Sequence, residues 1–241
     1  LEKMVQTIFV PERMIVSVVC EEADYQAVEA QIAFLLKNLY PSKKIVKERS
    51  LPELHLEKKN EGFMDASQVQ YVARAGNYVR HGFSYHGALR ILKVMGYDYL
   101  WINVRVKGGA YGCMNSYMRN GDTYFVSYRD PNLKKTDEIY DGIPQYLADF
   151  KADEREMTKY IIGTISDMDT PMNPSAKGAR SMTAYLQGLD FADIQKERDQ
   201  VIGATDEDIR GLKDLIASVL EEKNLCVIGN EDNLKSQSDM F

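Results

Sequence analysis

One short segment combines residue types and a spacing that could act on a polar ligand. Arg105 is followed six residues later by Tyr111, and the pair Gly108-Gly109 lies between them. Arginine stays cationic at neutral pH and offers several N–H donors to carbonyl or carboxylate oxygens. A protonated tyrosine hydroxyl can donate to an oxygen that gains negative charge. The pattern predicts a site for an electron-rich oxygen, where the glycines allow the backbone to approach the ligand closely.

The same residues also fit a structural role. Gly108-Gly109 could connect a helix to a strand, with Arg105 favourably placed at the helix C-terminus and Tyr111 at the start of the strand. A phosphate-binding loop at Lys107-Gly108-Gly109 is a weaker alternative, because no Gly-Lys-Ser/Thr follows and the next predicted element is a strand. The Gly-x-Gly-x-x-Gly pattern of dinucleotide-binding loops is absent as well.

The metal-binding residue types do not form a recognisable metal motif. The three histidines are His55, His81 and His86, and the three cysteines are Cys20, Cys113 and Cys226. The sequence contains neither H-x-x-E-H nor H-E-x-x-H, and the cysteines are too far apart for a C-x-x-C site or a disulfide framework. We expect loop or surface histidines, a packing role for Cys113, no metal site, and a reducing compartment such as the cytoplasm.

Length and composition indicate one large globular domain over residues 1–241, with two small domains as the alternative. Hydrophobic residues make up 44% and charged residues 27% of the chain, and the net charge is −6. This charge argues against nucleic-acid binding, which needs a basic surface, and against an anionic membrane surface. No apolar run reaches the roughly 18 residues of a membrane span. Because the chain opens on Leu-Glu-Lys, we expect a piece of a longer protein.

Hydrophobic periodicity predicts an α+β fold. We expect strands at about residues 8–20, 69–76, 111–118, 123–128 and 224–229, and helices at about 24–40, 86–104, 139–150, 152–165, from 175 onward, and 205–219. The Asn120-Gly121 pair predicts a two-residue hairpin turn, because both residues can take positive φ, and residues 41–61 read as a solvated connection. Since strands and helices alternate first and helices gather later, we expect an antiparallel or mixed sheet with helices packed on one face.

Several motifs together resemble the last domain of the presequence-protease branch of the insulinase/pitrilysin zinc metallopeptidases. They are Arg105–Gly112 (RVKGGAYG), Ser127–Leu133 (SYRDPNL), Glu61–Phe63, Ser67–Val72, His86–Leu89 and Tyr97–Trp101. The resemblance covers most of the chain and is densest from about residue 61 to 147.

This resemblance implies an insulinase/mitochondrial-processing-peptidase-like domain, the fourth of four around a chamber. It implies that Arg105 and Tyr111 act in catalysis and, with Gly108 and Gly109, bind the peptide opposite a zinc ion held by the first domain. The expected function is therefore the C-terminal domain of a zinc oligopeptidase that degrades unstructured peptides. Its partners would be peptides and the N-terminal domains of the same polypeptide, and the isolated fragment would be inactive. The alternative is a non-catalytic structural or interaction homologue. The family also occurs in organelles.

Overall fold

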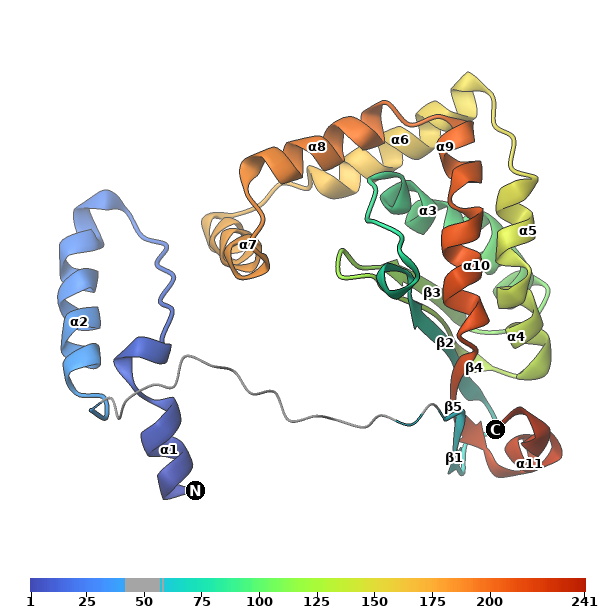
Figure 1. The fold of residues 1–241 in the computed structure, drawn as a ribbon, viewed down its shortest axis with the longest axis horizontal. Coiled ribbons are helices and arrows are strands. Elements are labelled where there is room, and N and C mark those ends of the chain that lie inside the picture. Colours follow the sequence, from blue (N-terminus) through green and yellow to red (C-terminus); the bar gives the residue numbers. More distant parts are fainter. Residues whose placement is uncertain (42–56, 58) are drawn as a thin grey trace. The chain divides into compact units, whose positions relative to one another are not determined.

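The computed structural model describes residues 1–41, residue 57 and residues 59–241 (Figure 1). The described residues divide into two compact units, one formed by residues 1–41 and 171–190 and the other by residues 57, 59–170 and 191–241. All candidate site residues belong to the second unit, which we call the sheet unit. Each unit is described by itself, and the single domain over residues 1–241 stays a prediction.

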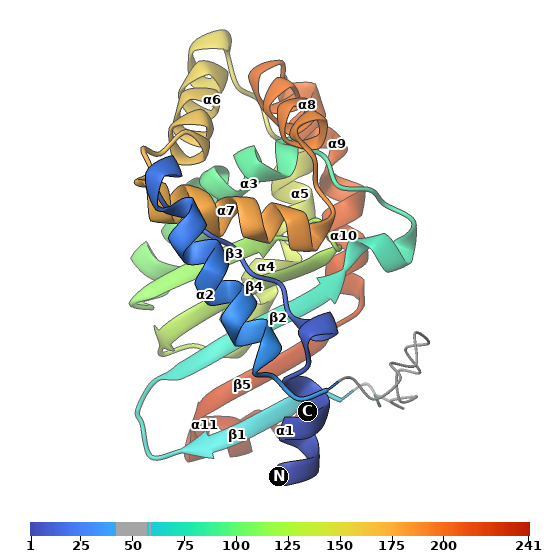
Figure 2. The ribbon, with the colours of Figure 1, turned by 90° about the vertical axis from the view of Figure 1, so that its left-hand side faces the viewer.

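The sheet unit is built on a five-stranded mixed sheet. Its strands are β1 (Glu61–Asp65), β2 (Gln70–Asn77), β3 (Gly112–Tyr117), β4 (Asp122–Asp130) and β5 (Asn224–Asn230). Their order across the sheet is β1-β5-β2-β4-β3, as Figure 2 shows. The pair β1–β5 is parallel and the other pairs are antiparallel. The hairpin β3–β4 turns at Gly121, whose positive φ of 95° is a conformation that glycine adopts readily. Asn120 has no positive φ, and the Met118 N–H donates to the Asp122 carbonyl at 2.9 Å. The loop therefore has three residues, 119–121, and the predicted two-residue turn was wrong.

Helices of the sheet unit lie between its strands along the chain and after the last of them. They are α3 (Ala88–Gly96), the π-helix η4 (Tyr97–Val106), α4 (Lys134–Asp141), α5 (Ile143–Ala148), α6 (Glu154–Met168), α8 (Phe191–Ile202), α9 (Asp206–Gly211), α10 (Lys213–Glu221) and α11 (Glu231–Ser236). The other unit contains α1 (Glu2–Ile8), α2 (Tyr25–Lys37) and α7 (Pro174–Gln187).

One face of the sheet carries the hydrophobic core. Val72, Phe125 and Val227 alternate with exposed neighbours along β2, β4 and β5 and are fully buried. They join one cluster with buried residues of α3 and α10, such as Met95 and Ile216. The alternation arises because successive side chains of a strand point to opposite faces. The predicted α+β class, with helices covering one face of a mixed sheet, is confirmed.

Two strand predictions were wrong. Within residues 8–20 the structure has the end of α1, a short 3-10 helix (Pro11–Arg13) and then no regular element. Val16 and Val19 are exposed there, because this apolar segment has no neighbouring strand among the described residues. Conversely, β1 begins at Glu61, at the end of the predicted connection. All residues of β1 are exposed, so its sequence lacks the alternation of buried and exposed residues that predicts a strand. The strand forms because it pairs with β5.

Helix boundaries show which local signals worked. Thr205 and Asp208 form the predicted capping box at the start of α9. The helix predicted to begin at Ser175 is instead capped by Asn173, whose side chain accepts a hydrogen bond from the Ala176 N–H. Pro174 takes the first helical position, where its missing N–H costs nothing. Most of the predicted connection at 41–61, including residue 55, lies outside the described residues.

Candidate functional site

Arg105 is positioned by a helix that packs tightly on the sheet. The π-helix Tyr97–Val106 continues α3, and Arg105 lies in its last turn. At the junction, a Cβ on Gly96 would come within 2.5 Å of the Asn115 side-chain nitrogen on β3, so the glycine permits the close approach of helix and strand. π-Helical turns are uncommon and occur often at functional sites. Arg105 itself is half-buried, whereas Val104 beside it is fully buried.

The two predicted glycines close this helix. A Cβ on Gly108 would lie 2.4 Å from the carbonyl oxygen of Val104, and Gly109 has a φ of +84°. The Gly109 N–H donates to the Arg105 carbonyl at 2.8 Å, and the Asn132 side chain donates to the Gly108 carbonyl at 2.5 Å. These contacts are those of a helix-to-strand connection, so the structural reading of Gly108-Gly109 holds. A contact of either glycine with a substrate stays a prediction.

The connection brings Arg105 and Tyr111 together. The Arg105 guanidinium carbon lies 4.0 Å from the Trp101 ring centroid and 5.7 Å from that of Tyr111. Both distances fall within the range of cation–π contacts. The Tyr111 N–H donates to the Arg129 carbonyl at 3.2 Å, which holds Tyr111 beside β4, and its side chain is 57% exposed. The two predicted site residues therefore share an accessible surface of the sheet unit.

Three residues that the sequence reading missed extend this surface. The Tyr128 ring packs edge-on against Tyr111 at 5.5 Å between centroids and stacks on Tyr71 at 6.5 Å. The Arg129 guanidinium carbon lies 5.5 Å from the Tyr111 ring centroid. We call the set Tyr71, Trp101, Arg105, Tyr111, Tyr128 and Arg129 the aromatic–arginine cluster.

The hairpin register explains part of this arrangement. Gly112 lies opposite Tyr128, and a Cβ on Gly112 would come within 2.6 Å of the Tyr128 ring. Glycine at this position therefore leaves room for the tyrosine ring to cross β3 toward Tyr111. The alternation of Tyr124, Val126 and Tyr128 along β4 was a sequence signal for Tyr128. No such signal existed for the contact with Tyr71, which comes from another strand.

A small cleft of about 100 Å³ opens beside Trp101, between the helix and β3. Cys113, Met114 and Asn115 form its β3 side. Burial raises the pKa of the Cys113 thiol to about 11. The thiol is therefore protonated at neutral pH and is a poor nucleophile, because the thiolate is the reactive form.

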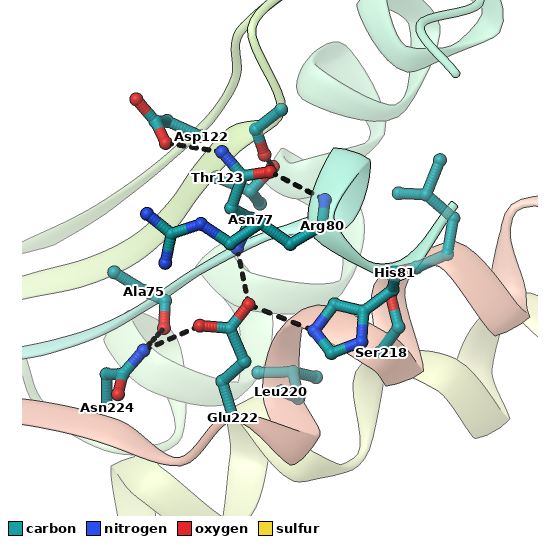
Figure 3. Close-up of polar contacts among 12 residues, drawn as sticks. Ala75, Asn77, Arg80, His81, Asp122, Thr123, Ser218, Leu220, Glu222 and Asn224 are labelled. Carbon is teal, nitrogen blue, oxygen red and sulfur yellow. Dashed lines mark hydrogen bonds and ion pairs between the residues drawn. The ribbon is translucent and has the colours of Figure 1, made fainter. Parts of the chain in front are cut away.

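The described histidines take part in local structure. The His81 ring lies 3.1 Å from a Glu222 carboxylate oxygen that also accepts the Asn77 N–H at 2.8 Å (Figure 3). Burial alone would raise the pKa of Glu222, but hydrogen bonds from Asn77 and His81 hold it below its usual range. The ring of His86 accepts the Ala88 N–H at 3.2 Å.

In the part of the chain that the structure describes, no three His, Cys, Asp or Glu side chains are grouped closely enough to hold a metal ion. A zinc site therefore does not fit these residues. No helix in the described ranges is long and apolar enough to cross a membrane.

Residues 60–231 match the family of the PreP C-terminal domain. The chain belongs to this family. Protein HypA of Clostridium perfringens is 43% identical over 242 residues, which cover 100% of this chain and 25% of that protein. Presequence protease 1, chloroplastic/mitochondrial, of Arabidopsis thaliana is 35% identical over 171 residues, or 70% of this chain and 16% of that protein. The resemblance inferred from the motifs is confirmed, and the chain spans a quarter or less of the length of these relatives. The predicted cytoplasmic location stays a prediction.

Solved structures agree on the fold. The peptidase M16 inactive domain from Pseudomonas fluorescens superposes with a TM-score of 0.58 at 15% identity, over 88% of this chain and 51% of that one. Pitrilysin superposes with a TM-score of 0.51 at 13% identity, over 86% of this chain and 23% of that one. This PreP C-terminal domain therefore has the architecture of M16 peptidase domains.

Proposed function

We propose that this chain is the C-terminal domain of a zinc-dependent oligopeptidase that degrades unstructured peptides. Its contribution would be to bind the peptide and stabilise the transition state through Arg105 and Tyr111. The observation that carries the proposal is the convergence of these two side chains on one accessible surface. Membership of the PreP C-terminal domain family supports it, as do relatives that are four or more times longer and include presequence proteases.

The described residues would act as one half of the catalytic site. Because they form no metal-binding group, the zinc ligands would belong to another part of the longer polypeptide. When bound there, zinc would supply the activation of the water that hydrolyses the peptide bond. The partners of this chain would therefore be the preceding domains and the peptide.

Arg105 is suited to hold the peptide backbone. Stacking on Trp101 at 4.0 Å orients the plane of its guanidinium group and leaves the N–H edges available to carbonyl oxygens. Tyr111 lies beside it and is 57% exposed, and its hydroxyl can donate to the scissile carbonyl oxygen as this oxygen gains negative charge. Gly108 and Gly109 present no side chain that would cover this approach.

The test is steady-state cleavage of a quenched fluorescent peptide by the longer polypeptide. Tyr111→Phe should lower kcat on the order of 10²-fold with little change in KM, because the hydroxyl acts mainly in the transition state. Arg105→Lys should raise KM, because a single ammonium cannot replace the planar donor fork. Tyr185→Phe, at an exposed tyrosine of α7, is the matched control.

An unchanged kcat for Tyr111→Phe would remove Tyr111 from the mechanism. A longer polypeptide that binds zinc but cleaves no peptide would favour the alternative, a non-catalytic interaction module. The chain alone should cleave nothing, and adding the missing domains in trans should restore activity.

A further inference from the structure

Strand β4 carries a bulge next to the aromatic–arginine cluster. Gln70 lies opposite Asp130 and Val72 opposite Ser127, so β4 has one residue more than β2 between these pairs. Arg129, in this interval, has a φ of +48°. This left-handed conformation is unfavourable for residues other than glycine, and such strain is often found at functional sites.

The bulge changes which side chains share a face. In a regular strand, neighbouring residues point to opposite faces of the sheet. Here the ring of Tyr128 and the guanidinium of Arg129 both reach Tyr111, each at 5.5 Å from its ring centroid. A bulge can re-aim a side chain in this way. The strained backbone therefore places a second cation against the Tyr111 ring, whose centroid lies 5.7 Å from the Arg105 guanidinium carbon.

Asp130 fixes the end of the bulge from the buried side. Its side chain is fully buried, where it accepts hydrogen bonds from the Asn132 N–H at 2.8 Å and the Thr136 hydroxyl at 2.7 Å. The backbone that bears Arg129 is thus anchored on the side opposite to the cluster. Arg129 is held in place by the fold, while its own side chain is exposed.

Within the described ranges, neither cation has an anionic partner. Among the described residues, neither the Arg105 nor the Arg129 guanidinium forms a hydrogen bond or ion pair. Arg74, by contrast, pairs with Asp137 at 2.6 Å. Two guanidinium groups converge on one ring with their donors unused, in a chain whose net charge is −6. A neutral carbonyl oxygen can be bound by one guanidinium group. A carboxylate has two oxygens that share a negative charge, so it can accept hydrogen bonds from two guanidinium groups.

We propose that Arg129, together with Arg105, forms a carboxylate-binding subsite beside Tyr111 that favours peptides bearing a negative charge at this position. The carboxylate would be either the C-terminus of the peptide or an Asp or Glu side chain. The inference rests on the proposed function in taking a peptide as the carrier of the carboxylate.

The test is a fluorescence titration of the 241-residue chain at low ionic strength. Trp101, the only tryptophan, lies 4.0 Å from the Arg105 guanidinium and reports occupancy. Four peptides of one unstructured sequence without tryptophan are compared: a free C-terminus, an amidated C-terminus, and the amide with one internal Asp or with Asn in its place. The wild type should bind the carboxylate-bearing peptides about tenfold more tightly than the neutral ones.

Variants separate the charge from the fold. Arg129→Gly should keep the bulge, because glycine adopts the left-handed conformation readily, and should abolish the preference for the carboxylate. Arg129→Lys should retain part of the preference, and Arg155→Gln, at an exposed arginine of α6, should leave it intact. Selectivity for the free C-terminus alone would assign the subsite to peptide ends. Selectivity for Asp over Asn would assign it to side chains.

Equal affinities for charged and neutral peptides in the wild type, or selectivity that persists in Arg129→Gly, would overturn the subsite. This readout is independent of catalysis. A longer polypeptide that cleaves no peptide would contradict the proposed function and leave a measured carboxylate preference standing. Normal peptide cleavage by the longer polypeptide, without any preference for a carboxylate, would contradict the subsite and leave the proposed function standing.

Discussion

Arg74 connects the sheet to the helices that cover it. Its side chain is 3% exposed and donates to Asp137 at 2.6 Å, to Asp141 at 3.1 Å and to the Leu220 carbonyl at 2.6 Å. One residue of β2 is thus bonded to α4 and to the C-terminal turn of α10. We expect Arg74→Ala to be among the more destabilising single substitutions in the sheet unit.

The magnitude follows from the burial of its partners. The Asp137 side chain is 17% exposed, so loss of Arg74 leaves a largely buried carboxylate without its cation, which costs about 3–5 kcal/mol. The Asp141 side chain is 51% exposed, and its pairing contributes less than about 1 kcal/mol. Asp137→Ala should therefore destabilise much more than Asp141→Ala. The double substitution Arg74→Met with Asp137→Leu should recover much of the loss, because it leaves no unpaired charge.

Urea unfolding followed by Trp101 fluorescence measures these differences, because the only tryptophan lies in the sheet unit and reports that unit. The slope of free energy against urea should be unchanged among the variants, which identifies an effect on stability alone. A loss below about 1 kcal/mol for Arg74→Ala would refute the reasoning. Equal losses for the two aspartate variants would refute it as well.

Three further predictions concern other residues of the sheet unit. Burial alone would raise the pKa of Glu197, but hydrogen bonds from Arg90 and Tyr85 hold this pKa below its usual range. Its stabilising contribution is thus present above the unfolded-state pKa and is lost as pH falls through the lower folded-state pKa. Glu197→Gln should lower the urea midpoint at pH 7, and below about pH 4.5 the midpoint of the variant should fall less steeply with pH than that of the wild type. Midpoints that fall in parallel for the two proteins would contradict this prediction. Gly112→Ala should displace the Tyr128 ring and cost about 1–3 kcal/mol, with a changed near-UV circular dichroism spectrum; an unchanged spectrum and midpoint would argue against the contact. Because burial raises the pKa of Cys113 to about 11, mass spectrometry at pH 8 should show its alkylation to be slower than that of the two exposed cysteines. Equal rates would contradict it.

Sequence by itself determined the features that depend on neighbouring residues. Gly121 marked the position of the hairpin turn, though not its length, because few residues tolerate positive φ. Thr205 with Asp208 marked the start of α9. Alternation located β2, since the period of a strand is independent of its partners, and the short apolar run at residues 224–229 located β5. The spacing of Arg105 and Tyr111 around two glycines indicated the candidate site, and several motifs together indicated the family.

Tertiary structure decided the features that depend on distant partners. Strand β1 exists because β5 supplies its hydrogen-bond partner, and the apolar segment at residues 8–20 forms no strand because the described residues offer it none. Tyr71 reaches Tyr128 only through the pairing of β2 with β4. Arg129 joins the cluster because an extra residue in β4 redirects its side chain, and a bulge is a property of two strands in register. Local sterics can be read along one chain, whereas pairing register exists only between strands.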